Sequence, residues 1–193
     1  MVNKDKRLTT YPFTVDRAKM IELMASFGWR TANEAEIPEM LELGERLIED
    51  QLISPDVLAR LHKLTGITAW VFGAPVEGLV ISVPLTQAGL DAVQDNVFVA
   101  KNPDDVHVAA AGQSCAGVYI GIYAGATKEA RKAVMSGAGV IRMAIYAQVP
   151  CFARAATEDG ARSMESLGWS PAGFGADKLW MQGALVVPEQ KVA

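Results

Sequence analysis

The stretch that decides the fold runs from Gly117 to Ala155 and reads GVYIGIYAGATKEARKAVMSGAGVIRMAIYAQVPCFARA. Its first part, Gly117 to Ala126, is rich in β-branched and aromatic residues and predicts a strand, whose glycines leave the backbone with little side-chain cover. From Thr127 to Ala147 apolar residues recur every three or four positions, which predicts a helix. Cys151 to Ala155 again has the composition of a strand. This order predicts two parallel strands joined by a right-handed crossover.

The chain after this unit predicts one more helix and the end of the sheet. Thr157 to Leu167 has helical spacing, and Gly168 stands where a helix C-terminal cap is expected. Ala176 to Val187 predicts a final strand or hairpin, and residues 188–193 form a polar tail.

Upstream of Gly117, two apolar runs predict an antiparallel hairpin. Ile67 to Phe72 and Val76 to Leu85 are joined by the sequence Gly-Ala-Pro, a turn of the kind that closes hairpins. The segment that follows has weaker patterns. Gln87 to Asn96 is ambiguous but compatible with a helix, Val97 to Ala100 predicts a brief strand, and Asn102 to Asp105 has the residues of a turn.

The amino-terminal part of the chain predicts a short strand followed by two helices. The first of these helices begins with a capping box, an Asn followed three residues later by a Glu. These elements are Trp29 to Thr31, the helix begun by Asn33 and Glu36, and Pro55 to Leu64. Residues 1–28 contribute a loose arm and a short amphipathic helix that ends before Gly28, so residues 29–187 are expected to form the main domain.

Composition excludes several functional classes. The 193 residues carry a formal charge of −4 and have a pI near 5.2, which provides no basic surface for nucleic acid. The longest apolar run falls short of the roughly 20 residues of a membrane span, and the start of the chain lacks the apolar stretch of a secretory signal, so we expect a cytoplasmic protein without a membrane partner. No metal site is expected, because the few potential soft ligands do not stand at metal-ligand spacing. They are Cys115, Cys151, His62 and His107.

The predicted order of elements resembles the GNAT superfamily of acyl-CoA-dependent N-acyltransferases. Trp29 to Pro38 is similar to the family's opening strand and first helix, and Phe152 to Trp169 is similar to its fifth strand and next helix, with the ending Leu-Gly-Trp. The roughly 25 residues from Thr127 hold the place of the cofactor-binding helix. The resemblance covers residues 28–185. It implies an α/β (α+β) fold with a mixed central sheet, an antiparallel N-terminal half and a splayed parallel strand pair, flanked by helices.

This resemblance implies acetyl-CoA or another acyl-CoA as cosubstrate. In the family, the strand before the long helix binds the pantetheine arm with exposed backbone groups, and the helix amino terminus takes the pyrophosphate, which free amides and the helix dipole favour. The cofactor-binding positions carried over are Ile120, Gly121, Ile122, Tyr123, Gly125, Ala126, Thr127, Lys128, Ala130 and Arg131. The implied reaction is N-acyl transfer, most simply N-acetyl transfer, to a small-molecule amine or a protein amino group by direct attack in a ternary complex, and a homodimer is compatible with the family.

The chain departs from the family at two places. The family's phosphate loop, Q/R-x-x-G-x-G/A, falls on Gly125 to Ala130, where only Ala130 fits. A second registration begins the motif at Arg131 and uses Gly137 and Gly139, and helical periodicity favours the first. The position where many members carry a Tyr that protonates the leaving thiolate is Met164, which cannot donate a proton.

Acyl transfer to an amine needs a base and groups that polarise the thioester carbonyl. On strand alternation, Tyr119 and Tyr123 are expected on one face of their strand, with Val118, Ile120 and Ile122 on the other. The catalytic candidates are therefore Tyr119, Tyr123 and Glu77, with Asp104, Asp105 and His107 as further bases and Trp70 as a further aromatic neighbour. The two cysteines are not expected to act as nucleophiles.

Two functional hypotheses remain open, together with an unrelated α/β fold. The first is the N-acyltransferase. The second is a non-catalytic GNAT-like domain that binds an acyl-CoA or a partner, which Met164 and the altered phosphate loop favour.

Overall fold

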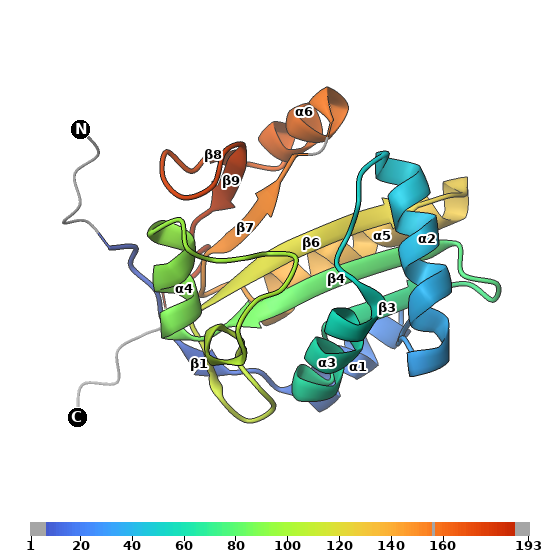
Figure 1. Ribbon diagram of the computed structural model, residues 1–193, viewed down its shortest axis with the longest axis horizontal. Coiled ribbons are helices and arrows are strands. Elements are labelled where there is room, and N and C mark those ends of the chain that lie inside the picture. The colour runs from blue at the N-terminus through green and yellow to red at the C-terminus, as the bar shows by residue number, and fades with distance from the viewer. Residues whose placement is uncertain (1–6, 156, 188–193) are drawn as a thin grey trace.

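A computed structural model describes residues 7–155 and 157–187 and has a mixed sheet at its centre (Figure 1). The seven strands lie in the order β2-β3-β4-β6-β7-β9-β8. Neighbours β6 and β7 are parallel, and the other adjacent pairs in this sheet are antiparallel. The strands are β2 Trp29–Thr31, β3 Ala69–Phe72, β4 Gly78–Leu85, β6 Gly117–Gly125, β7 Cys151–Arg154, β8 Ser170–Pro171 and β9 Leu179–Gln182. This confirms the mixed α/β class, the antiparallel N-terminal half and the parallel pair.

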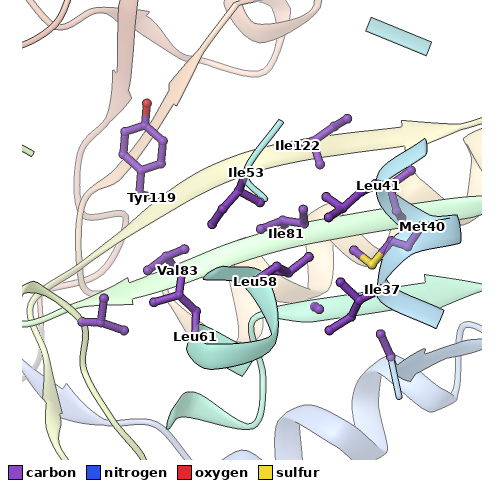
Figure 2. Packing of buried hydrophobic residues seen from close by; sticks show 14 of the residues in the cluster. Ile37, Met40, Leu41, Ile53, Leu58, Leu61, Ile81, Val83, Tyr119 and Ile122 are labelled. Atoms are coloured by element: carbon purple, nitrogen blue, oxygen red, sulfur yellow. The ribbon is translucent and has the colours of Figure 1, made fainter. Parts of the chain in front are cut away.

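Helices cover both faces of this sheet, and each face buries its own apolar cluster. Helices α2 (Ile37–Ile48) and α3 (Pro55–Thr65) pack on the face that buries Ile81, Val83 and Leu79 of β4. Figure 2 shows this packing, with Ile37, Met40 and Leu41 of α2 against the sheet. Helices α1 (Arg17–Ala25) and α5 (Lys128–Val140) pack on the opposite face with Trp29 and Trp70. The remaining helices are α4 Gln87–Gln94 and α6 Glu158–Ser166.

Local capping decides where several helices begin. The Oδ1 atom of Asn33 accepts from the amide of Glu36 at 3.1 Å, and Glu36 Oε2 accepts from the amide of Asn33 at 3.0 Å. This reciprocal arrangement confirms the predicted capping box, although the first turn, Glu34–Glu36, is a 3-10 turn that leads into α2. Thr127 and Thr157 cap α5 and α6 with a single bond each, since their hydroxyl oxygens accept from an amide three residues on.

The predicted long helix after Thr127 is divided into two parts. The α-helical part ends at Val140, and a π-helical turn, Ile141–Ile145, follows. The amide of Tyr146 donates to Ile141 O at 2.9 Å, which is the spacing of a π turn. The expectation of one regular helix to Ala147 is therefore wrong at its end.

One further strand prediction is wrong, and another is confirmed in one of its two forms. Val97 to Ala100 does not form a strand, because the amides of Val97 and Phe98 both donate to Ala92 O and so close the end of α4. The predicted final strand within residues 176–187 is confirmed as β9, whereas the alternative of a hairpin within that segment does not form. Strand β9 pairs instead with β8, which precedes that segment, and the loop of residues 172–178 connects the two.

Within the described residues, the arm is not loose. Phe13–Thr14 (β1) pairs with Ser114–Cys115 (β5) in a separate two-stranded sheet. The hydroxyl of Thr10 also donates to Ala116 O at 2.5 Å. These contacts link residues separated by about one hundred positions, so local sequence patterns do not reveal them. Residues 1–6 and the predicted polar tail, 188–193, lie outside the described residues.

No helix within residues 7–155 and 157–187 combines the length and the hydropathy that crossing a bilayer requires.

Candidate functional site

The parallel strands β6 and β7 separate part of the way along β6. Their register runs from Val118 opposite Cys151 to Ile120 opposite Ala153. Strand β6 continues to Gly125, whereas β7 ends at Arg154. On its other side, β6 stays paired with β4 over its full length. Within the described part of the chain, β6 therefore has no partner strand on the β7 side beyond Ile120, as the expected splay requires.

A β-bulge at Gly121 lies where this opening begins. Ile81 of β4 is opposite Ile122, and the next residue, Ser82, is opposite Ile120, so Gly121 is an extra residue on β6. A Cβ atom at Gly121 would come within 3.1 Å of Ile81 Cγ2. A bulge re-aims the side chains that follow it, because it shifts the alternation of faces by one residue.

The bulge overturns the predicted facing of the tyrosines. Tyr119 and Ile122 belong to the cluster beneath α2 and α3, and Figure 2 shows both on that face. Ile120 belongs to the opposite cluster, and Tyr123 packs against it. Tyr119 and Tyr123 therefore point to opposite sides of the sheet, and Ile122 does not share a face with Ile120. The extra residue at position 121 is the physical reason.

Helix α5 begins directly after β6, at the open end. Thr127 is its N-cap, and its Oγ1 accepts from the amide of Ala130 at 3.1 Å. Among the described residues, no hydrogen bond engages the amides of Lys128 and Glu129. Such free first-turn amides, together with the positive end of the helix dipole, favour an anion. The exposed side chains of Lys128 and Arg131 add positive charge.

Glu77 lies at this helix start and not at the bulge. The Thr127 hydroxyl donates to Glu77 Oε2 at 2.9 Å, and the amide of Ala126 donates to Glu77 O at 2.8 Å. Glu77 precedes Gly78, the residue of β4 that is opposite Gly125. The bulge is opposite Ile81, about 10 Å further along β4 at 3.3 Å per residue. The carboxylate of Glu77 therefore borders the anion end of the gap.

Tyr119 lies next to the point where β6 and β7 part. Its ring centroid is 5.1 Å from that of Phe98 and its register partner on β7 is Phe152. Burial raises the pKa of Tyr119, and the positive charge of Arg154 partly offsets this. The phenol consequently stays protonated at neutral pH and can donate a proton. Burial likewise raises the pKa of Tyr123.

The structure does not bring the other candidate bases to the bulge. His107 lies in the segment between α4 and β5, and its ring centroid is 6.1 Å from that of Phe98, which in turn contacts Tyr119. Asp105 is ion-paired with Arg60. Asp104 is an exposed residue at the start of the short 3-10 turn Asp105–His107. Trp70 is fully buried on the α5 face and donates from Nε1 to Ile67 O, so it does not join Tyr119.

Met164 of α6 is half-buried and packs against the apolar cluster on the α5 face. It has a packing role in the structure.

The two cysteines are free and buried. Burial raises the pKa of Cys115 and that of Cys151 to about 12. Both thiols are therefore neutral at physiological pH and are poor nucleophiles.

The helix start is compatible with the first of the two predicted registrations of the phosphate loop and not with the second. Because α5 begins after Thr127, Gly137 and Gly139 lie inside the helix and offer no free amides. A Cβ atom at Gly137 would come within 2.9 Å of Trp29 Nε1, so this glycine permits close packing of the helix on the sheet. Gly139 faces open space, so it does not serve the same purpose.

Sequence reasoning did not find a large hollow at the carboxyl end of β7. Its volume is about 1460 Å³, and α6, the β8–β9 loop, the end of α4 and the arm at Arg7 line it. These elements are far apart in the chain, and the loop residues Gly173 and Gly175 were the one available signal, since both have positive φ. Phe98 and Arg154 were also missed, because their proximity to Tyr119 depends on tertiary packing.

No protein-family model and no curated protein sequence matches this chain. Among solved structures, it is similar to a Corynebacterium glutamicum protein described as histone acetyltransferase HPA2 and related acetyltransferase. The two share 13% identity with a TM-score of 0.48, and the similarity covers 83% of this chain and 97% of that chain. At this level the similarity says nothing about the activity of the present chain.

Proposed function

We propose that this protein is an acyl-CoA-dependent N-acyltransferase, with the acyl-CoA bound along the open edge of β6. The observation that carries the proposal is the combination of a parallel pair that parts after Ile120 and a helix that starts at the end of the same strand. The strand offers unpaired main-chain groups to an amide-rich pantetheine arm. The helix offers the free amides of Lys128 and Glu129 to a pyrophosphate.

The residues of the β6–α5 connection fit such a ligand in size and charge. Gly125 and Ala126 keep the loop slim, and Arg131 lies over it, with Nη1 3.4 Å from Ala126 O. Glu77 and Glu129 are unfavourable neighbours, because their carboxylates carry the same sign of charge as the phosphates. The acyl-CoA, when bound, supplies an acyl group already activated as a thioester.

Tyr119 is the proposed proton donor to the leaving thiolate. Its raised pKa keeps the hydroxyl protonated, and it flanks the position where the strands part. This assignment replaces the role that Met164 cannot fill. Tyr119→Phe should lower kcat by about 10²-fold or less and leave acyl-CoA affinity unchanged. Tyr123→Phe on the opposite face is the matched control and should retain activity.

Binding is tested by isothermal titration of the full chain with acetyl-CoA and by hydrogen exchange of residues 121–131. Arg131→Gln should weaken acetyl-CoA binding by roughly three- to tenfold, because one charge-assisted contact to phosphate is lost. Lys132→Gln, which removes a neighbouring exposed cation of α5, should leave binding unchanged. Failure of acetyl-CoA and longer acyl-CoAs to bind or to protect residues 121–131 would refute the proposal.

A non-catalytic acyl-CoA-binding domain is the second candidate, which Met164 and the altered phosphate loop favour. The two are separated by measuring thiol release. Acyl-CoA binding without release of CoA in the presence of a broad panel of amines would favour the non-catalytic reading. Release with any amine would exclude it.

A further inference from the structure

The hollow at the carboxyl end of β7 is lined by segments that lie far apart in the chain. Its volume, about 1460 Å³, is sufficient for a small molecule. Ligands of α/β sheets bind preferentially outside the carboxyl ends of strands. Ala155 and Thr157, which line the hollow, follow the last residue of β7.

One wall of the hollow is formed by β9, which pairs with β7 beside the proposed reaction centre. It includes Leu179 and Trp180 of β9, which are the register partners of Arg154 and Ala153. Ala153 is the residue at which β7 leaves β6.

An aromatic contact extends this connection on the α2 face. Phe174, which lines the hollow, contacts Phe152 at 6.3 Å between ring centroids. Phe152 is the register partner of Tyr119. A ligand in the hollow would therefore be one strand away from Tyr119 and from the opening of the gap.

The charges around the hollow leave an excess of free carboxylate. Arg7 is engaged with Asp95 through two hydrogen bonds of 3.0 Å, so these two charges cancel. None of the ion pairs formed by the described residues includes Glu158, Asp177 or Lys178. Two free acids against one free base leave a net negative wall.

One of these acids lies at the start of α6. Glu158 is the first residue of the helix, where the positive end of the helix dipole stabilises a carboxylate. The half-buried residues Trp180 and Phe174 also line the hollow, Trp180 beside Ala153 on the α5 face and Phe174 beside Phe152 on the α2 face. Aromatic faces bind both apolar bodies and cations.

We infer that this hollow binds the acceptor, and that the acceptor is a primary amine with an aromatic or apolar body and no carboxylate of its own. The inference rests on the proposed function and names its substrate class. Glu158 and Asp177 attract the ammonium group, while Trp180, on the same side of the sheet as α6, contacts the body. Starting from the ammonium ion, transfer forms the C–N bond, breaks the C–S bond and releases two protons from nitrogen. One proton ends on the thiol and the other in solvent.

The test uses 2-phenylethylamine as the probe and the full chain without acyl-CoA. Isothermal titration at low ionic strength should show binding, with chemical-shift changes at the Trp180 indole. Glu158→Gln with Asp177→Asn should weaken it by roughly three- to tenfold, since two partly solvated ion-pair contacts are lost. Added salt should weaken binding to the unmodified chain more than to this double variant.

Asp159→Asn is the matched control, because Asp159 neighbours Glu158 on α6, is exposed, and does not line the hollow. It should leave binding unchanged. Equal loss in the control and the double variant, or no loss in either, would overturn the assignment of Glu158 and Asp177. Tighter binding of phenylalanine than of 2-phenylethylamine would overturn the proposed substrate class, because phenylalanine adds a carboxylate.

The same measurements separate this inference from the proposed function. If acetyl-CoA binds at residues 121–131 but 2-phenylethylamine does not perturb Trp180, the acceptor inference fails and the acyltransferase proposal stands. If the amine binds in the hollow but no acyl-CoA binds at the gap, the acyltransferase proposal fails, and with it the assignment of this ligand as acceptor.

Discussion

The two halves of strand β6 differ in what surrounds them. From Gly117 to Ile120, β6 has a strand on each side, β4 and β7, and its side chains are buried in both apolar clusters. From Gly121 to Gly125 it keeps β4 alone, and the start of α5 lies close to its end. The bulge at Gly121 marks the change.

This difference teaches how one strand can provide both stability and a binding edge. Main-chain groups of the first half are satisfied within the sheet, whereas those of the second half remain for a ligand. Glycine serves the two halves differently. Gly117 lies in a space where a side chain would make ordinary contacts, and Gly125 lies against the backbone of α5.

The largest expected effect comes from a substitution in the half of β6 that has only β4 as a neighbour, Gly121 to Gly125. In Gly125→Ala, the new Cβ would lie 2.6 Å from the amide nitrogen of Arg131 and 2.7 Å from the carbonyl carbon of Ala130, so the backbone must move. We expect a loss of about 2–3 kcal/mol in the free energy of unfolding, measured by urea denaturation. Gly117→Ala is the control. Its Cβ would be 3.4 Å from Pro150 O, and we expect less than about 1 kcal/mol. Equal losses would contradict the distinction between the halves.

The next prediction concerns the two cysteines that are buried beside the paired half of β6. Burial raises the pKa of Cys115 and Cys151 from 9.0 to about 12, so folding favours the neutral thiols. Their contribution to stability is complete below pH 9 and is lost as pH rises from about 9 to about 12, because the unfolded chain releases these protons first.

Between pH 8 and pH 10 we expect the free energy of unfolding to fall by about 1 kcal/mol for each thiol. Urea denaturation at several pH values measures this change. Replacing both cysteines by alanine should flatten this part of the pH profile. An unchanged profile in the double variant would show that other groups cause the dependence.

A third prediction sharpens the role of α5, which packs against β6 on one face. Gly137→Ala would place a Cβ 2.9 Å from Trp29 Nε1, and we expect a loss of about 1–2 kcal/mol in unfolding free energy. Gly139→Ala enters open space within the same helix, and we expect a gain of about 0.5–1 kcal/mol from helix propensity. Thermal unfolding of both variants would show the opposite signs. A gain in both would mean that the contact with Trp29 relaxes at little cost.

The smallest expected effect concerns the anion end of the gap. Glu77→Gln keeps an acceptor for the Thr127 hydroxyl but removes the negative charge beside the start of α5. We expect acetyl-CoA to bind roughly two- to fivefold more tightly, with little change in stability, as measured by titration. Glu129→Gln removes an exposed acid of the same turn without disturbing this hydrogen bond. It tests whether the loss of any negative charge near the helix start gives the same gain in affinity. An equal gain in both variants would deny Glu77 a specific role.

Much of the fold could be predicted from local patterns. The capping box of Asn33 and Glu36, the start of α5 at Thr127 and the end of α6 before Gly168 depend on hydrogen bonds and dihedrals within a few residues. The strands on either side of α5, β6 and β7, could be predicted from their composition. The prediction of a brief strand at Val97 was wrong, because the amides of Val97 and Phe98 donate to Ala92 O at the end of α4.

The site was less accessible from the sequence. Alternation placed Tyr119 and Tyr123 together, and one extra residue in β6 separated them. Glu77 was considered as a base, and the structure places it against Thr127, which is 50 positions away. Neither the bulge nor this contact has a local signature, since both depend on how β4 and β6 are aligned.

By itself, the amino-acid sequence determined the periods, caps and turns of this protein, and with them a mixed sheet built around a parallel strand pair. These features arise from contacts between residues close in the chain. Tertiary structure alone decided where β6 and β7 part, which face Tyr119 takes, and which distant segments enclose the hollow beside Trp180. Those outcomes depend on strand register, and register is set by pairing between segments that are far apart in the chain.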